Sequence, residues 1–251
     1  HARMCEGDLA MSRGDAAGAV AILEEARQQF EALHDPWGLM VCLTALGVVA
    51  LDQGDPAAAV TAFQRVQTIM TRHQLPAHYE AHTLGNLAVA YRLLGRAAEA
   101  FATAGDAFRL ASHARRASVA GAAQGEMARY HLDHGDPSQA APLAHASLTT
   151  FWEIGSMWDL TPALELAAMV LAAMHQPALA VQLLAAAAGL REAMPYPIGA
   201  SEEPAVVGAL AALTAAMGET SFARAWEAGR AQPPDASVRS ALAGLAAGAG
   251  A

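Results

Sequence analysis

A turn signal that recurs at a nearly constant spacing constrains the fold of this chain more than any other feature. The spacing is about 40 residues, within the range of known helical repeats. Its members are Gly14-Asp15, Gly54-Asp55-Pro56, Gly95-Arg96, Gly135-Asp136-Pro137, His175-Gln176-Pro177 and, after a slightly longer interval, Gly218-Glu219. Glycine ends a helix in the left-handed conformation, aspartate caps the next helix and proline occupies its first turn. The spacing therefore predicts an array of helical repeats.

The residues that flank each turn repeat in the same register. Before the turn, small and large apolar residues recur at helical spacing: Leu43, Leu46, Gly47 and Ala50, then Leu84, Leu87, Ala88 and Tyr91, then Leu164, Ala167, Ala168 and Leu171. After it, a second apolar stripe recurs: Ala19, Leu23 and Ala26; Ala59, Phe63 and Val66; Ala100, Ala104 and Ala107; Ala140, Ala144 and Ser147; Ala180, Leu184 and Ala187. Both stripes predict buried helix faces, and the second places helices over 56–73, 97–113, 137–153 and 177–194.

The composition agrees with an all-α fold. The 251 residues are 54% hydrophobic, only 16% charged and 6% aromatic, and alanine dominates the apolar residues, which favours closely packed helices. The formal net charge of −9 argues against direct contact with nucleic acid or an anionic membrane, because both require a basic surface. From Leu166 to Leu190 the chain has no charged residue, but His175-Gln176-Pro177 divides this stretch into two short helices rather than one membrane span.

The chain has none of the usual residue sets of an enzyme. All 15 positive charges are arginines, which excludes a Walker lysine, a Schiff-base lysine and a Ser–Lys dyad. Cys5 and Cys42 lack CxxC spacing, so we expect two reduced thiols. The pairs His78/His82 and His131/His134 lack the further ligand that a zinc site needs. We therefore expect no metal, no cofactor and no catalytic activity.

Two repeats resemble the tetratricopeptide pattern. The matching residues are Leu46-Gly47, Ala50, Gly54, Ala59, Phe63 and Val66 in one repeat, and Leu87-Ala88, Tyr91, Gly95, Ala100, Ala104 and Ala107 in the next. The long period is similar to the repeat domain of MalT-like STAND regulators, and residues 163–231, with Leu190-Arg191-Glu192-Ala193 and Ala225-Trp226, resemble the closing segment of LuxR-type STAND regulators. This resemblance implies a bacterial, cytoplasmic signalling or transcriptional regulator whose ATPase and DNA-binding modules lie elsewhere in the parent protein.

The repeat register predicts the domain organisation. We expect a right-handed superhelix of about six antiparallel helix pairs over residues 1–232, with turns near 14, 54, 95, 135, 175 and 218. A C-terminal capping helix and a flexible Ala/Gly tail are expected over 233–251. Trp37 and Trp158 occupy equivalent places in their repeats, each at the same distance in sequence before a turn. We expect both to pack over the next helix, with an aromatic contact to a partner as the alternative.

The first helix of each pair lines the concave groove in tetratricopeptide arrays, and this predicts the candidate ligand contacts. They are His82, Asn86, Arg92, Glu126, Arg129, Asp133 and Glu165. Arg92 and Arg129 would bind a carboxylate of a ligand and the two glutamates its cationic end. The alternative is that these arginines and glutamates pair with one another. The predicted function is a non-catalytic sensor module that binds a peptide, a small effector or a partner protein; the alternative is a scaffold that joins subunits as a homo-oligomer without a small ligand.

Overall fold

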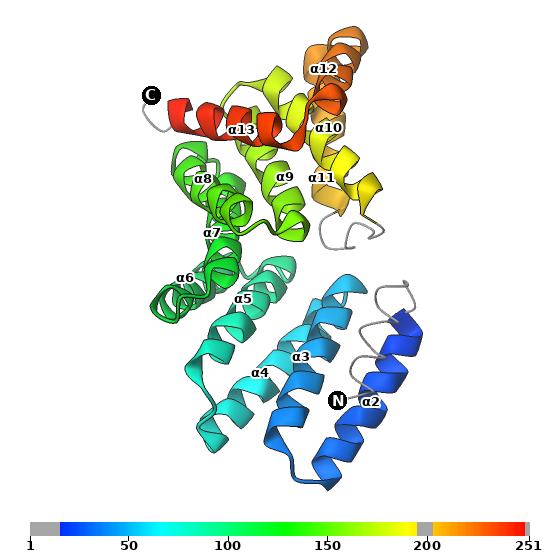
Figure 1. Cartoon of the computed structure of the whole chain (residues 1–251), viewed down its shortest axis with the longest axis vertical. Coiled ribbons are helices and arrows are strands. Elements are labelled where there is room, and N and C mark those ends of the chain that lie inside the picture. Colours follow the sequence, from blue (N-terminus) through cyan, green and yellow to red (C-terminus); the bar gives the residue numbers. More distant parts are fainter. Residues whose placement is uncertain (1–15, 195–202, 249–251) are drawn as a thin grey trace. The chain divides into compact units, whose positions relative to one another are not determined.

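The structure, a computed structural model, describes residues 16–194 and 203–248, and in these ranges every element of secondary structure is an α-helix. The helices are α2 (Ala16–Ala32), α3 (Pro36–Asp52), α4 (Pro56–His73), α5 (Ala77–Leu93), α6 (Ala97–His113), α7 (Ala117–Asp133), α8 (Pro137–Glu153), α9 (Met157–Ala173), α10 (Pro177–Ala193), α11 (Glu203–Met217), α12 (Glu219–Ala231) and α13 (Pro234–Gly248) (Figure 1). The all-α prediction is confirmed. The predicted ranges match α4, α6 and α8, and α10 ends one residue earlier than expected. The Gly14-Asp15 turn, Cys5 and residues 249–251 of the predicted tail lie outside the described residues.

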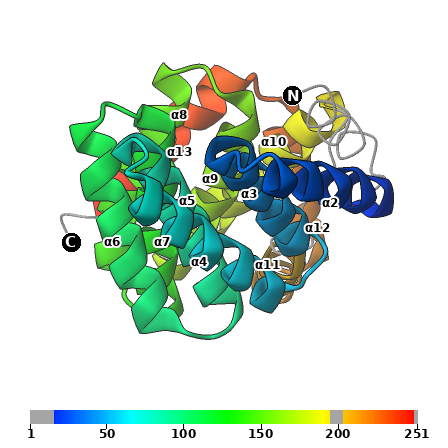
Figure 2. The same ribbon diagram turned by 90° about the horizontal axis from the view of Figure 1, so that it is seen from below.

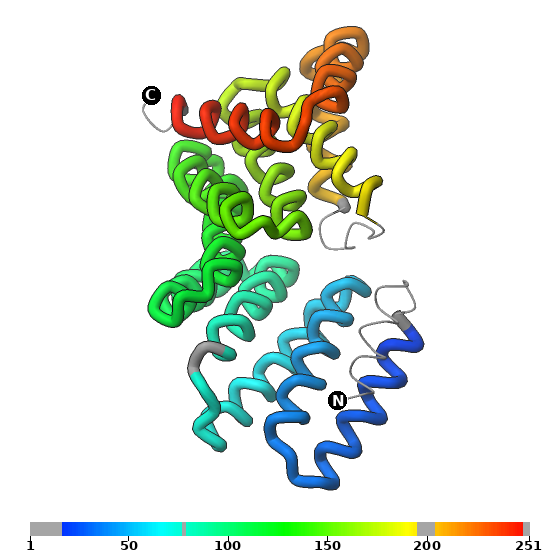
Figure 3. The backbone as a smooth tube through the Cα atoms, in the orientation of Figure 1, coloured from blue at the N-terminus to red at the C-terminus, as the bar shows by residue number. Residues whose placement is uncertain are grey.

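The helices from α2 to α10 follow the predicted period, with two helices in each repeat. Successive helices begin at a nearly constant interval of half the predicted period, and linkers of three residues join them (Figure 3). The predicted repeat therefore consists of two nearly equal halves, each a helix and a linker.

Nearly all of these linkers have the same backbone conformation. The middle residue has a positive φ in seven of the eight linkers: His34, Gly54, Gly95, Arg115, Gly135, Gly155 and His175. In the α3–α4 linker, the N–H groups of Gly54 and Asp55 donate to the carbonyls of Leu51 (3.0 Å) and Ala50 (2.8 Å), which is the Schellman pattern. The Asp55 carboxylate then accepts the Ala58 N–H at 3.0 Å. One residue thus closes a helix and caps the next, which keeps the linker short.

The chain divides into two compact units, with the boundary after Leu110 in the last turn of α6. In the N-terminal unit, α2 packs on α3, α3 on α4 and α4 on α5 (Figures 1 and 2). Its core has two clusters. One surrounds Phe63 and includes Leu87 and Tyr91, and the other contains Met40 and Met70 with Trp37 at its edge.

The C-terminal unit has one continuous core. Leucine, valine and alanine side chains from α7 to α10 join residues of α11, α12 and α13 in a single cluster. Helix α13 packs on α8, α9 and α10 and buries Val238, Ala241 and Leu245 against them (Figure 1).

Both predicted stripes are buried, except that Leu46 is partly exposed. Phe63 and Val66 are fully buried, as are Ala167 and Leu171. The uncharged stretch from Leu166 to Leu190 forms most of α9 and α10, with the predicted break at the linker between them. Within the described residues, no helix combines the length and apolar character that a membrane span requires.

Candidate functional site

The seven predicted ligand contacts lie on three helices, each of which is the first helix of a predicted helix pair. Helix α5 of the N-terminal unit carries His82, Asn86 and Arg92; in the C-terminal unit, α7 carries Glu126, Arg129 and Asp133, and α9 carries Glu165. His82 and Asp133 are exposed, Glu165 is buried and the other four are partly buried. The three residues of α7 are spaced three and four positions apart, so they lie on one side of that helix.

Two of these residues hold buried hydrogen-bond donors without a partner. Asn86 Nδ2 and Arg129 Nε are the buried side-chain polar atoms that make no hydrogen bond in the described part of the chain. Such an atom costs about 1–3 kcal/mol relative to a paired one. Asn86 lies in the N-terminal unit and Arg129 in the C-terminal unit, and each donor by itself is suited to a ligand carbonyl or carboxylate.

Glu165 has a partner that the sequence analysis missed. Its two carboxylate oxygens accept from Arg191 Nε at 2.9 Å and Arg191 Nη2 at 2.7 Å, and the two side chains are 5% and 15% exposed. This fork joins α9 to α10 in the interior of the C-terminal unit. A cationic ligand at Glu165 would compete with Arg191, so the role of Glu165 as a ligand contact stays a prediction.

The described residues include no group of three or more His, Cys, Asp or Glu side chains placed to hold a metal ion. His134 Nδ1 lies 2.7 Å from the Tyr130 carbonyl oxygen, and its ring lies against the Tyr130 ring. Burial raises the pKa of the Cys42 thiol above its ordinary value, which disfavours the reactive thiolate. The side chain of His78 lies outside the described part of the structure.

Two hollows have linings that include none of the seven residues. In the C-terminal unit, one of about 470 Å³ is lined mainly by apolar side chains of α9 and α11, among them Met169, Ala172 and Leu213, with His175 at the linker. In the N-terminal unit, one of about 390 Å³ is bordered by Phe30, His34, Asp35, Arg72 and His73. The sequence analysis did not predict α11 as a wall of the first hollow.

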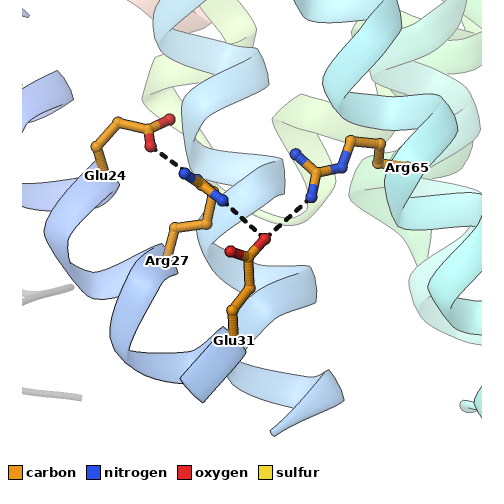
Figure 4. A network of polar contacts seen from close by, with 4 residues as sticks. All are labelled: Glu24, Arg27, Glu31 and Arg65. Atoms are coloured by element: carbon orange, nitrogen blue, oxygen red, sulfur yellow. Dashed lines mark hydrogen bonds and ion pairs between the residues drawn. The ribbon is translucent and has the colours of Figure 1, made fainter. Parts of the chain in front are cut away.

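A polar network joins two helices of the N-terminal unit. Arg27 on α2 donates to Glu24 and Glu31, both at 2.7 Å, and Arg65 of α4 reaches Glu31 at 3.0 Å (Figure 4). Burial alone would raise the pKa of Glu31, but the hydrogen bonds and charges of Arg27 and Arg65 outweigh it and hold this pKa below its ordinary value. The network contains two arginines and two glutamates, so its charges balance. It is therefore suited to linking α2 to α4.

The helix pairs, the tight linkers and the small-residue faces define a helical repeat protein of the tetratricopeptide-like class. Among solved structures, the chain is similar to the nearly identical TPR-like repeats of a Podosopora anserina protein assigned as a kinesin light chain, with 18% identity, a TM-score of 0.56 and coverage of 76% of this chain and 93% of that one. It is also similar to BtubC (BKLC) from P. vanneervenii, with 16% identity, a TM-score of 0.59 and coverage of 91% and 90%. No family model and no curated protein sequence matches the chain.

Proposed function

We propose that this chain is a non-catalytic binding module. In this proposal, side chains on the first helix of each helix pair hold a peptide, a small effector or a partner protein. The observation that carries the proposal is the pair of unpartnered donors at Asn86 and Arg129. Repeat arrays of this class present extended surfaces to partners. An acceptor from a ligand would complete the hydrogen bonding of each donor and remove its desolvation cost.

The sequence resemblance to STAND regulators supports a more specific setting for this function. In that setting the module is the sensor region of a bacterial, cytoplasmic signalling or transcriptional regulator. A ligand that binds one arrangement of the parent protein more tightly would shift the equilibrium toward that arrangement.

The test is a calorimetric screen of short acidic peptides and of di- and tricarboxylates such as succinate and citrate. Arg129→Met keeps most of the side-chain volume and removes the donors, so it is expected to weaken binding at least about tenfold. Because the Arg129 Nε has no partner to lose, the melting temperature is expected to stay the same or rise. Arg224→Met is the matched control, since it removes one exposed arginine from the same unit.

Two results would contradict this proposal. One is binding that neither Arg129→Met nor Asn86→Ala weakens. The other is a large loss of stability in Arg129→Met, which would give the guanidinium a structural role.

The alternative function, an oligomerisation scaffold, is favoured by a separate observation on α11. The chain has no charged residue from Pro204 to Gly218, and many side chains of α11 are exposed, among them Val207 at 57%. A second copy that covers this face would bury the apolar surface. Sedimentation equilibrium decides this alternative: dimers that Val207→Glu dissociates support it, and a monomer at all concentrations contradicts it.

A further inference from the structure

The hollow of the N-terminal unit lies where three helix ends meet. Its lining comes from the last turn of α2, from the α2–α3 linker with the first turn of α3, and from the last turns of α4. Phe30, Leu39 and Ile69 are its large apolar side chains. Its volume of about 390 Å³ falls within the range of small-molecule sites, which is about 300–1,000 Å³.

The apolar side chains of this hollow are held in place by the rest of the unit. Leu39 and Ile69 pack against the buried cluster that contains Met70. The Phe30 ring lies over Gly38 of α3, so close that a Cβ atom there would be 2.2 Å from the ring. The apolar wall is therefore formed before any ligand binds, and it is suited to an aromatic or branched aliphatic group.

The two carboxylates at the hollow already have donors within the chain. Asp35 Oδ1 accepts two backbone N–H groups from the first turn of α3, at 3.0 and 3.1 Å. Glu31 Oε1 accepts from Arg27 at 2.7 Å and from Arg65 at 3.0 Å. A cationic ligand would therefore compete with donors that the protein itself supplies.

The basic side chains at the hollow have no such partners. Among the described residues, the side chains of His34, Arg72 and His73 make no hydrogen bond and no ion pair, and all three residues are exposed. The arginine is charged at any pH at which proteins are folded, and each imidazole carries at least one N–H donor. The hollow therefore offers open donors and a positive charge, while its acceptors are engaged. This asymmetry favours an anionic ligand.

We propose that this hollow binds a small carboxylic acid with an aromatic or branched aliphatic body. The Arg72 guanidinium holds the carboxylate, the two histidines supply further donors, and the body of the ligand covers the apolar wall. This site uses neither Asn86 nor Arg129, so either proposal can fail without the other.

Calorimetric titration of the full chain with a matched set of small compounds tests the proposal. Phenylpropionate carries both the acid and the ring, phenylpropionamide replaces the carboxylate by a neutral amide of similar shape, and propionate lacks the ring. Phenylpropionate is expected to bind at least about tenfold more tightly than either of the others.

Substitutions of arginine give the site of binding. Arg72→Met removes the guanidinium at an exposed position and should weaken the binding of phenylpropionate about tenfold. Arg109→Met is the matched control, since it removes another exposed arginine from the same unit and should leave the affinity unchanged. Arg129→Met should also leave it unchanged, which separates this site from the donors of the proposed function. Circular dichroism establishes that each variant is folded.

Histidine ring signals in nuclear magnetic resonance spectra provide an independent readout. The signals of His34 and His73, assigned with His34→Gln and His73→Gln, should move on titration with phenylpropionate, whereas that of His145 in the C-terminal unit should not. Equal binding of the acid and the amide, equal weakening by Arg72→Met and Arg109→Met, or no binding at about 10 mM acid would overturn the proposal. Tighter binding of phenylethylamine than of phenylpropionate would also overturn it, in favour of a cationic ligand at Glu31 and Asp35.

Discussion

The N-terminal and C-terminal units have similar helix lengths and linkers, but the closest approach to a glycine is made by a side chain in the first and by backbone in the second. In the N-terminal unit, aromatic side chains occupy the space that glycine leaves: a Cβ atom at Gly38 would lie 2.2 Å from Phe30 Cδ1, and one at Gly47 would lie 2.5 Å from Phe63 Cε1. In the C-terminal unit, a Cβ atom at Gly229 would lie 2.2 Å from the carbonyl oxygen of Gln182, which is backbone of α10. Gly229 thus accommodates a neighbouring helix, whereas Gly121 and Gly244 of the same unit accommodate side chains, as the glycines of the N-terminal unit do.

This difference accompanies two kinds of core. Aromatic rings that fill gaps give the separate clusters of the N-terminal unit, each centred on a few large residues. The C-terminal unit has a continuous alanine- and leucine-rich core, and α12 approaches the backbone of α10 directly at Gly229. The two units should therefore respond differently to substitutions that add or remove volume.

The largest effect is expected from Phe63→Ala in the N-terminal unit. Phe63 is fully buried, and its removal leaves a cavity, so we expect a loss of about 4 kcal/mol in the free energy of unfolding. Chemical denaturation followed by circular dichroism measures this loss.

A double-mutant cycle with Gly47→Ala tests whether Phe63 fills the space above that glycine. Gly47→Ala alone should destabilise the protein, because the new methyl group meets the ring. In the Phe63→Ala background the same change should cost much less. Additive effects would contradict the packing described for the N-terminal unit.

Gly229→Ala tests the backbone contact of the C-terminal unit, with an expected loss of about 3 kcal/mol. The clash is with the backbone of Gln182, so no side-chain substitution at position 182 should rescue it. Gly208→Ala on α11 is the control, since a Cβ atom there meets nothing within 4 Å. It should raise stability by about 0.5–1 kcal/mol through helix propensity. Similar gains in the two variants would show that helix propensity, rather than close approach, governs glycine in this unit.

The sequence predicts much of the fold because its signals are local. The Gly-Asp-Pro turns, as at Gly54 and Gly135, place linkers to within a residue. The linkers at His34 and Arg115 have the same left-handed residue without glycine, so they have no comparable sequence signal. Each repeat divides into two nearly equal halves, each of one helix and one linker, and this division became visible only in the structure.

The two tryptophans show that an equivalent position in the repeat does not determine how exposed a side chain is. Trp37 and Trp158 occupy the second position of α3 and α9, yet Trp37 packs edge to face on Tyr79 at 4.6 Å while Trp158 is 54% exposed. Tyr79 lies in α5, the first helix of the next pair, and α5 begins close to where the regular helix spacing places it. Helix α11 begins at Glu203, later in the sequence than the spacing of the preceding helices would place it. Trp37 and Trp158 therefore differ in exposure although they occupy the same place in the repeat.

The candidate site was predicted less fully for a related reason. Helical spacing gives the side of a helix on which Arg129 or Glu165 lies, but it does not give the partner on another helix. Arg191, which lies on the following helix, satisfies the Glu165 carboxylate. The unpartnered donors of Asn86 and Arg129 likewise depend on packing between helices.

The buried ion pair of the C-terminal unit is expected to contribute less than the backbone contact. Glu165→Gln leaves Arg191 with one neutral acceptor in the interior, which we expect to cost about 2 kcal/mol of stability. The double variant Glu165→Met with Arg191→Met removes both charges and should recover most of this loss. If the double variant is as unstable as Glu165→Gln, the fork contributes more than charge compensation.

The surface network of the N-terminal unit is expected to have the smallest effect and a distinct pH dependence. Glu31 has a lowered pKa in the folded state, so its contribution is present above its unfolded pKa of about 4.3 and is lost as the pH falls through the lower folded value. Because Glu31 is 38% exposed, solvent screening limits this contribution to about 0.5 kcal/mol. Glu31→Gln should therefore destabilise the protein slightly at neutral pH and flatten the fall in stability in the acid range, as measured by urea denaturation at a series of pH values. Glu25→Gln, a change of an exposed residue on the same helix, is the control. An equal flattening in both variants would show that general charge, rather than the contacts of Glu31 with Arg27 and Arg65, sets the acid response.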